Sequence, residues 1–287
     1  MVHKEIADSF DASSSYWREI YGERAFQGAV YRDRQACALA WIDELRLPAG
    51  SPVLEIGCGA GFLTVSLADR GYRVDSIDSS AAMVESTRAR IGDAGFAATA
   101  TARVEDVHAL SARDGSYAAV VALGVIPWLH SPDRALREIA RVLRPGGAAI
   151  LTADNRARLN FLLDPRFNPV LVYPIKRRAK VLLRRLGKRP LGMLPDVHYP
   201  AELDRLVRAA GLEKQRSRTI GFGPFTFFGM RLLSDARSLA LHQRLQRLAD
   251  RGVPFVRAGG MNYLVLATKP VTGARDVPPG SRVAAGR

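Results

Sequence analysis

The middle of the chain alternates short apolar runs with longer segments in which apolar residues recur at helical spacing. The short runs are typical of strands buried on both faces, and the longer segments are typical of helices that connect one strand to the next. This alternation predicts a doubly wound, mostly parallel α/β sheet with helices on both faces. The expected strands cover 53–56, 73–77, 100–104, 117–123 and 148–152, and the expected helices cover 32–45, 62–70, 81–91 and 132–143.

The alternation stops after Asp154 and resumes at Pro200. From there the pattern predicts a helix over 200–211 that ends at a glycine, and then a strand near 215–220. A helix over 230–250 and a last strand over 262–268 complete the expected fold. The segment between the two regular parts therefore reads as an insert.

The net charge of +14 is concentrated in this insert. Residues 155–195 hold eleven Lys or Arg and one acid, so they carry 11 − 1 = +10, and the rest of the chain carries 14 − 10 = +4. The two cysteines, Cys37 and Cys58, form no CxxC pair and no disulfide framework, and no secretory signal is visible. We expect a cytoplasmic protein, with no metal, because no His, Cys or Asp cluster has ligand spacing.

The stretch EIGCGAGF places alternate glycines directly after an expected strand. Gly57, Gly59 and Gly61 let the backbone bend sharply and approach a ligand closely, which a Cβ atom would prevent. A pyrophosphate loop would read GxGxxG, whereas this one reads GxGxG and follows Glu55, whose carboxylate suits an ammonium group instead. Asp78 ends the next expected strand, where a carboxylate can accept hydrogen bonds from ribose hydroxyls.

Together with three later elements, this loop resembles the class I S-adenosylmethionine-dependent methyltransferases. In that family an ExGxGxG segment, an acid ending the second strand, an acidic pair after the third strand and a PGG turn recur in this order. Here they are Glu55 to Gly61, Asp78, Glu105-Asp106 and Pro145-Gly146-Gly147. The resemblance implies a seven-stranded Rossmann-like methyltransferase fold, S-adenosyl-L-methionine as cofactor and methyl transfer as the activity. The alternative is a Rossmann-like domain that holds another nucleotide.

The resemblance also implies roles for individual residues. Glu55 and the glycine loop would hold the methionine part of the cofactor, Asp78 the ribose, and Asp106 the adenine amino group. Met83 would pack near the adenine, with ordinary core packing as the alternative, and the Val107 N–H would complete the adenine edge. Glu105, beside the working acid, is expected to face solvent. The implied cofactor-binding residues are Glu55, Gly57, Cys58, Gly59, Gly61, Asp78, Ser79, Met83, Asp106, Val107 and Leu123.

The methyl acceptor is less well defined by the sequence. Enzymes that methylate nucleobase amines typically carry an (Asn/Asp)-Pro-Pro-(Tyr/Phe) motif after the fourth strand, whereas this chain has GVIPWLH there. Transfer to oxygen or carbon is therefore favoured. An acceptor that must lose a proton needs a general base, and His130 is a candidate because histidine titrates near neutral pH. His198 and Tyr199 are further candidates, and the alternative for His130 is a helix cap or a solvent-facing side chain.

The insert also has a pattern of its own. A helix beginning after Pro174 would present an apolar stripe bordered by Lys and Arg, which is typical of helices lying on an anionic membrane surface. The alternative is a helix that packs this stripe on the core. Nucleic-acid binding is disfavoured, because few aromatic residues interleave with the charges. The loop 221–229, GFGPFTFFG, can line an apolar acceptor pocket, enter lipid or face the core.

Together these features predict methyl transfer to a small hydrophobic or lipid-like acceptor, on oxygen or carbon, at the cytoplasmic side of a membrane or in the cytoplasm. The alternatives are an RNA or protein methyltransferase docking through the insert, and a catalytically silent cofactor-binding protein at a membrane. The oligomeric state stays open. The expected parts are a lid segment (1–30, as in many relatives), the cofactor-binding core (31–154), the basic cap (155–199), the C-terminal part of the core (200–268) and a disordered tail (269–287).

Overall fold

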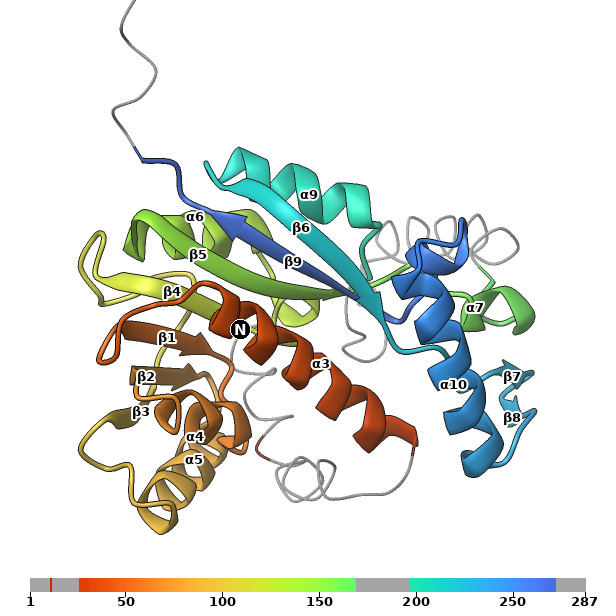
Figure 1. Ribbon diagram of the computed structural model, residues 1–287, viewed down its shortest axis with the longest axis horizontal. Helices are drawn as coiled ribbons and strands as arrows, with labels where there is room; N and C mark the ends of the chain where they lie inside the picture. Colours follow the sequence, from red (N-terminus) through yellow and green to blue (C-terminus); the bar gives the residue numbers. More distant parts are fainter. Residues whose placement is uncertain (1–10, 12–25, 169–196, 272–287) are drawn as a thin grey trace, which may run out of the picture.

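The computed structural model describes Asp11, residues 26–168 and residues 197–271 of the 287-residue chain (Figure 1). These residues form a seven-stranded sheet in the order β3-β2-β1-β4-β5-β9-β6, in which β9 runs antiparallel to both of its neighbours. The predicted doubly wound, mostly parallel sheet is therefore confirmed. The strands are β1 (Pro52–Ile56), β2 (Arg73–Asp78), β3 (Ala100–Val104), β4 (Tyr117–Ala122), β5 (Leu143–Asp154), β6 (Glu213–Ile220) and β9 (Asn262–Thr268).

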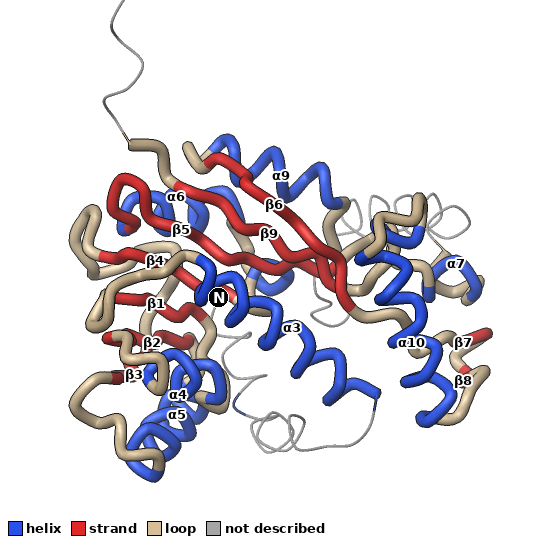
Figure 2. Tube along the Cα trace, in the orientation of Figure 1, coloured by secondary structure: helices blue, strands red, loops and turns tan. Residues whose placement is uncertain are grey.

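Helices cover both faces of the sheet (Figure 2). On one face lie α3 (Phe26–Glu44), α4 (Phe62–Ala68) and α5 (Ala81–Asp93), and on the other lie α6 (Pro132–Val142) and α9 (Pro200–Ala209). Beyond the end of β6, α10 (Asp235–Asp250) packs against α3. The short elements are α7 (Asn160–Leu163), η1 (Ile126–Trp128), η2 (Val256–Ala258) and the strands β7 (Thr226–Phe227) and β8 (Met230–Arg231).

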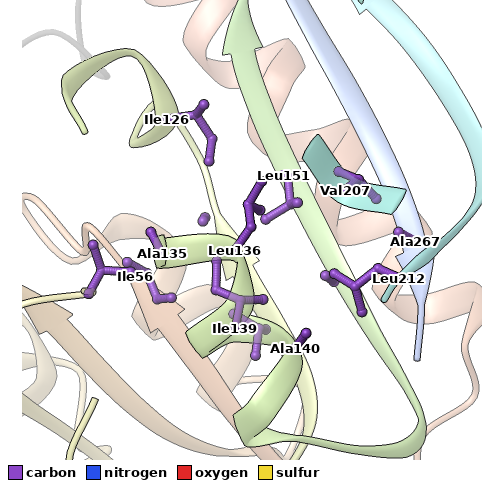
Figure 3. Close-up of a cluster of buried hydrophobic side chains, with 14 of the residues drawn as sticks. Ile56, Ile126, Ala135, Leu136, Ile139, Ala140, Leu151, Val207, Leu212 and Ala267 are labelled. Carbon is purple, nitrogen blue, oxygen red and sulfur yellow. The ribbon is translucent and has the colours of Figure 1, made fainter. Parts of the chain in front are cut away.

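The all-apolar β4 is buried on both sides because it lies at the centre of the sheet. Its side chains alternate between the two cores, so that Val120 faces one and Val121 the other. Figure 3 shows the core under α6, where Leu136 and Ile139 meet Leu151 of β5. Both faces of the sheet are thus packed, and the edge at the carboxyl ends of the parallel strands is left for a ligand. Among the described residues, no helix is long and apolar enough to cross a membrane.

Three elements, α10, β5 and α3, start five residues or more away from the predicted positions. The helix expected at 230–250 is wrong in its first turn, because Met230–Arg231 pairs with Thr226–Phe227 as a hairpin and α10 begins at Asp235. The buried Asp164 holds this hairpin by accepting hydrogen bonds from the Thr226 hydroxyl at 2.7 Å and from the Gly229 N–H at 3.0 Å. The residue that stabilises the hairpin, Asp164, is thus 62 residues away from Thr226 in sequence, so the local pattern does not show that the helix starts late.

The strand expected at 148–152 begins earlier, at Leu143, and so includes the Pro-Gly-Gly segment. Lys269, just beyond β9, explains this extension. The Gly146 N–H donates to the Lys269 carbonyl, and the Lys269 N–H donates to the Gly147 carbonyl, each at 2.8 Å. The helix expected from 32 likewise begins earlier, at Phe26. Of the lid expected at 1–30, residues 26–30 form the start of α3, and the others apart from Asp11 lie outside the described residues. Most of the insert (169–196) and the tail beyond 271 also lie outside them.

Candidate active site

A cavity of about 520 Å³ opens at the carboxyl ends of β1, β2, β4 and β5. This edge includes the point between β1 and β4 where the strand order reverses, which is where open α/β sheets bind ligands. α3 crosses the cavity and forms one wall through Phe26, Val30 and Arg34. The glycine loop after β1 also lines the cavity, as do residues at the end of β5, after it, and at the start of β9.

The glycine loop has the backbone that the sequence predicts. Gly57, Gly59 and Gly61 all have positive φ, at 73°, 54° and 79°. A Cβ atom on Gly57 would lie 2.5 Å from a methyl carbon of Val125, so this position excludes any side chain. Thr87 of α5 fastens the loop, because its hydroxyl donates to the Gly59 carbonyl at 2.8 Å. The loop is therefore a rigid cradle with room for a ligand.

Glu55 lies buried at the base of the cavity, 3% exposed. The Thr64 and Ser76 hydroxyls both donate to its Oε2 atom, at 2.5 and 3.1 Å. Neither of these two hydrogen bonds involves Oε1. Burial raises the pKa of Glu55 to about 8 against the lowering effect of the two hydroxyls. A buried carboxyl with this pKa is suited to a cationic partner, such as the ammonium group of a methionine moiety.

Asp78, at the end of β2, also lines the cavity. Its two oxygens accept hydrogen bonds from the N–H groups of Gly59 and Ser80, each at 3.0 Å. Burial raises the pKa of this carboxyl, and the backbone donors oppose the rise. Asp11 binds the same region, since it accepts a hydrogen bond from the Ala82 N–H at 3.1 Å. The side chain of Asp78 is thus fixed in place beside the glycine loop, as ribose binding requires.

The residues implied for the adenine divide into two groups. Met83 and Val107 line the cavity, and both are buried. Glu105 lines it too, so the expectation that it faces solvent is wrong: its side chain is 9% exposed and accepts a hydrogen bond from Nε of Arg103 at 2.7 Å. Asp106 does not line it. Instead, its Oδ1 atom contacts the backbone N–H of His108 at 2.9 Å and the Nδ1 atom of the same residue at 2.6 Å. The buried His108 lines the cavity, although its sequence position alone did not mark it.

The three candidate bases lie outside the cavity wall. His130 is exposed and stacks on the ring of His108, with 3.9 Å between the ring centroids. His198 pairs with the end of β5 through its backbone, because its N–H donates to the Asp154 carbonyl at 2.9 Å. Tyr199 is 39% exposed at the start of α9. None of the three is among the residues that line the cavity. The other residues implied for cofactor binding, Cys58, Ser79 and Leu123, do line it.

Arg34 is a site residue that the sequence reasoning missed. It is buried on α3, and one of its terminal nitrogens would lie 2.9 Å from a Cβ atom on Gly124. The guanidinium therefore rests against the backbone just after β4, one strand from Glu55. The cation of Arg34 beside the end of β4 and the carboxylate of Glu55 in β1 match the carboxylate and ammonium ends of a methionine. The helical position of Arg34, inside an apolar face, was the available signal.

A second missed group lies where β5 ends and β9 begins. Asp154, Arg158, Met261 and Asn262 line the cavity there, and the Asn262 amide donates to Oδ1 of Asp154 at 3.0 Å. Apolar side chains complete this end of the cavity. They include Phe26, Val30, Trp128, Leu129 and Met261. Among the described residues, no group of three or more His, Cys, Asp or Glu is arranged to hold a metal ion.

Comparison with known proteins agrees with this geometry. Residues 54–151 match the model of a family described as a methyltransferase domain. A ubiquinone biosynthesis O-methyltransferase of Xanthomonas axonopodis pv. citri (strain 306) is 30% identical over 212 residues, which cover 74% of this chain and 81% of that protein. The enzyme of the same name from Pseudomonas aeruginosa (strain UCBPP-PA14) is 28% identical over 229 residues, covering 78% and 89%.

Solved structures show the same fold at low sequence identity. Magnesium protoporphyrin IX methyltransferase from Synechocystis PCC 6803, solved with bound S-adenosylhomocysteine, is 16% identical with a TM-score of 0.59, covering 94% of this chain and all of that one. The cyclase SpnF is 20% identical with a TM-score of 0.61, covering 93% and 95%. Fold, glycine cradle and buried carboxylates thus agree with the sequence relatives: the chain belongs to the class I S-adenosylmethionine-dependent methyltransferases.

Proposed function

We propose that the chain transfers a methyl group from S-adenosylmethionine to a hydroxyl oxygen of a small hydrophobic acceptor. The observation that carries this proposal is the continuity of one cavity from the glycine loop to an apolar wall that includes Phe26, Trp128 and Leu129. The relatives named ubiquinone biosynthesis O-methyltransferase support oxygen as the acceptor atom. They also support a lipid-like acceptor, since that name denotes the synthesis of a quinone with an apolar tail.

The protein's task in such a transfer is mainly positional. The bound cofactor supplies an electrophilic methyl group on a sulfonium, whose leaving group needs no protonation. Glu55, Asp78 and the glycine loop, which line the β1 and β2 side of the cavity, would hold the cofactor. The apolar wall holds the acceptor and excludes water, so that the hydroxyl meets the methyl carbon in line.

A hydroxyl acceptor must also lose its proton. The cavity-lining acids Glu55 and Asp78 belong to the cofactor, and Glu105 and His108 follow β3 on the adenine side. Asp154 ends β5 on the acceptor side, with one oxygen bonded to Asn262. These positions favour Asp154 as the general base over His130, His198 and Tyr199, which do not line the cavity.

A labelling experiment tests the proposed function. The purified chain is incubated with methyl-labelled S-adenosylmethionine and a host extract separated into lipid, small polar and macromolecular fractions. We expect label in the lipid fraction, in a product whose methyl group is bonded to oxygen. Label in RNA or protein would support the docking alternative, and cofactor binding without any labelled product would support the catalytically silent alternative.

We also propose that the basic insert contacts an anionic membrane surface during this reaction. The support is its sequence pattern, since residues 169–196 lie outside the described part of the chain. Four substitutions to Gln at Arg177, Arg178, Arg184 and Arg185 are expected to weaken binding to phosphatidylglycerol vesicles more than tenfold, because each basic residue adds about 1 kcal/mol near such a surface.

A matched variant carries four substitutions to Gln at exposed arginines of α10 and its end, Arg237, Arg244, Arg247 and Arg251. It removes the same charge from a different surface and is expected to sediment with vesicles as the unmodified chain does. Equal losses in the two variants would mean that total charge, and not the insert, attracts the protein to lipid.

A further inference from the structure

The acceptor end of the cavity contains a cation with no ion-pair partner. Arg158 follows β5 and lines the cavity, and in the described part of the chain no carboxylate forms a salt bridge with it. Its Nε atom is buried without a hydrogen-bond partner. Its guanidinium carbon lies 3.8 Å from the ring centroid of Phe161, which covers one face of the cation. An arginine held in this way keeps its planar donors for a ligand.

Arg158 is half-buried, and the lack of an ion-pair partner among the described residues is costly for its charge. Desolvation lowers the pKa of the Arg158 guanidinium, and the negative charge of Asp154 opposes the lowering only through space. Buried charges in proteins are normally paired and hydrogen-bonded, because an isolated charge loses its hydration without compensation. An anionic ligand in the cavity would form an ion pair with Arg158 and so compensate for the hydration that the guanidinium has lost. The same ion pair would stabilise the bound ligand.

The loop that carries Arg158 is fixed by buried polar contacts. The amide of Asn155 is fully buried and donates to the carbonyls of Ala258 and Gly260, each at 2.7 Å. Its side-chain oxygen accepts a hydrogen bond from the Ala157 N–H at 2.9 Å. The Leu159 N–H donates to the Gly259 carbonyl at 2.9 Å. Both neighbours of Arg158 are therefore anchored, and its side chain emerges from a rigid base.

Sheet order separates Arg158 from the cofactor. The glycine loop follows β1, Arg34 rests beside Gly124 after β4, and Arg158 follows β5, one strand further along. Arg34 is thus the cation next to the methionine end of the cofactor. Arg158 lies with Asp154 and Asn262 at the end of the cavity that the acceptor occupies under the proposed function.

We infer that Arg158 binds a carboxylate group carried by the methyl acceptor, a role that rests on the proposed function. The planar guanidinium matches a planar carboxylate through two parallel hydrogen bonds. Asp154 in the same wall disfavours a group with several negative charges, such as a diphosphate. The acceptor is accordingly a hydroxylated, partly apolar acid, whose hydroxyl faces the methyl group while its carboxylate faces Arg158.

Binding to the full chain saturated with S-adenosylhomocysteine tests this role by titration calorimetry. The probes are protocatechuate, which is a dihydroxybenzoate, and its uncharged primary amide. We expect the benzoate to bind about 10- to 30-fold more tightly than the amide, as one charge-assisted hydrogen-bonded pair provides. Arg158→Met should reduce this ratio to about one, and Arg158→Lys, which keeps the charge without the fork, should give an intermediate ratio.

Arg156→Met is the matched control, because Arg156 is two residues away and does not line the cavity. It should leave the ratio unchanged, and unchanged amide affinity in Arg158→Met would show that this variant is folded. Three results would overturn the inference: equal binding of the two probes by the unmodified chain, binding of neither, or an unchanged ratio in Arg158→Met. Tighter binding of the corresponding phosphonate than of the benzoate would overturn the carboxylate assignment.

Methylation of the same probes is measured in parallel, so that the two proposals fail separately. Selective binding of the benzoate without any methylated product would contradict the proposed function and leave Arg158 as an anion-binding residue. Methylation of benzoate and amide with equal efficiency would support the proposed function and contradict the role of Arg158.

Discussion

Glu55→Gln is expected to weaken the binding of S-adenosylhomocysteine by about 10- to 100-fold and to remove the proton release that accompanies binding. In the cofactor-free protein, burial raises the pKa of Glu55 to about 8, so at pH 7 the carboxyl is mostly protonated. An ammonium group beside it favours the carboxylate and lowers that pKa. Binding at pH 7 therefore releases close to one proton, which a glutamine cannot supply.

Calorimetry in buffers of different ionisation enthalpy measures this release directly. The number of protons should fall towards zero as the pH rises past about 8, where Glu55 is already ionised before the cofactor binds. Glu85→Gln is the control, because Glu85 is an exposed residue of α5 whose side chain is paired with Arg88. Proton release that persists in Glu55→Gln would assign it to another group and contradict this prediction.

The same carboxyl links pH to the stability of the cofactor-free protein. Its pKa is raised on folding from 4.5 to about 8, so the folded state binds more protons than the unfolded state between these values. The free energy of unfolding should therefore decrease as the pH rises through this range. Glu55→Gln removes the decrease, and bound cofactor offsets it by pairing with the ionised form.

The part of the cavity formed by Glu55, the glycine loop and Asp78 could be predicted, because its information is local in sequence. Glu55 and the alternate glycines follow one strand directly, and Asp78 ends the next strand. In a parallel sheet the carboxyl ends of neighbouring strands meet at one edge, so strand order alone brings these residues together. The fastening contacts, such as the hydroxyl of Thr64 on Glu55, needed the structure, and so did Arg34, which reaches the cavity from α3.

The acceptor half could not be predicted, because its residues come from parts of the chain that no local pattern connects. Arg158 follows β5 in the expected insert, and Asn262 reaches the site from β9, which is inserted antiparallel between β5 and β6. A single Asp or Arg after a strand carries no distinctive spacing. Candidate bases were therefore chosen by residue type, which favoured His130 although its ring stacks outside the wall.

The misplaced start of α10 has a similar cause. Residues after Gly229 have helical periodicity, yet Met230–Arg231 forms a strand because the buried Asp164 fixes the preceding turn. The resulting hairpin leaves Phe227, Phe228 and Met230 exposed, whereas Phe222 of the same aromatic loop is buried. The two halves of this loop thus have different environments, which the composition GFGPFTFFG does not distinguish.

Asp154→Asn is expected to lower kcat by about 10²- to 10⁴-fold with a much smaller change in the KM for S-adenosylmethionine, if Asp154 removes the acceptor proton. Asparagine keeps the size and the oxygen that accepts from Asn262 at 3.0 Å, so the loop geometry should be retained. Initial rates with an acceptor identified by labelling measure the effect. Cofactor affinity should stay unchanged, because Asp154 lies at the end of β5, away from the glycine loop.

His130→Gln provides the opposing measurement. Because His130 is exposed and stacks on His108 outside the cavity, this variant is expected to change kcat by less than about threefold. A large loss of kcat in His130→Gln together with a small loss in Asp154→Asn would identify His130 as the general base. Its ring would then have to move into the cavity wall when substrates bind. Small losses in both would mean that the acceptor arrives already ionised, in which case the rate should rise with pH through the pKa of the acceptor itself rather than that of a protein group.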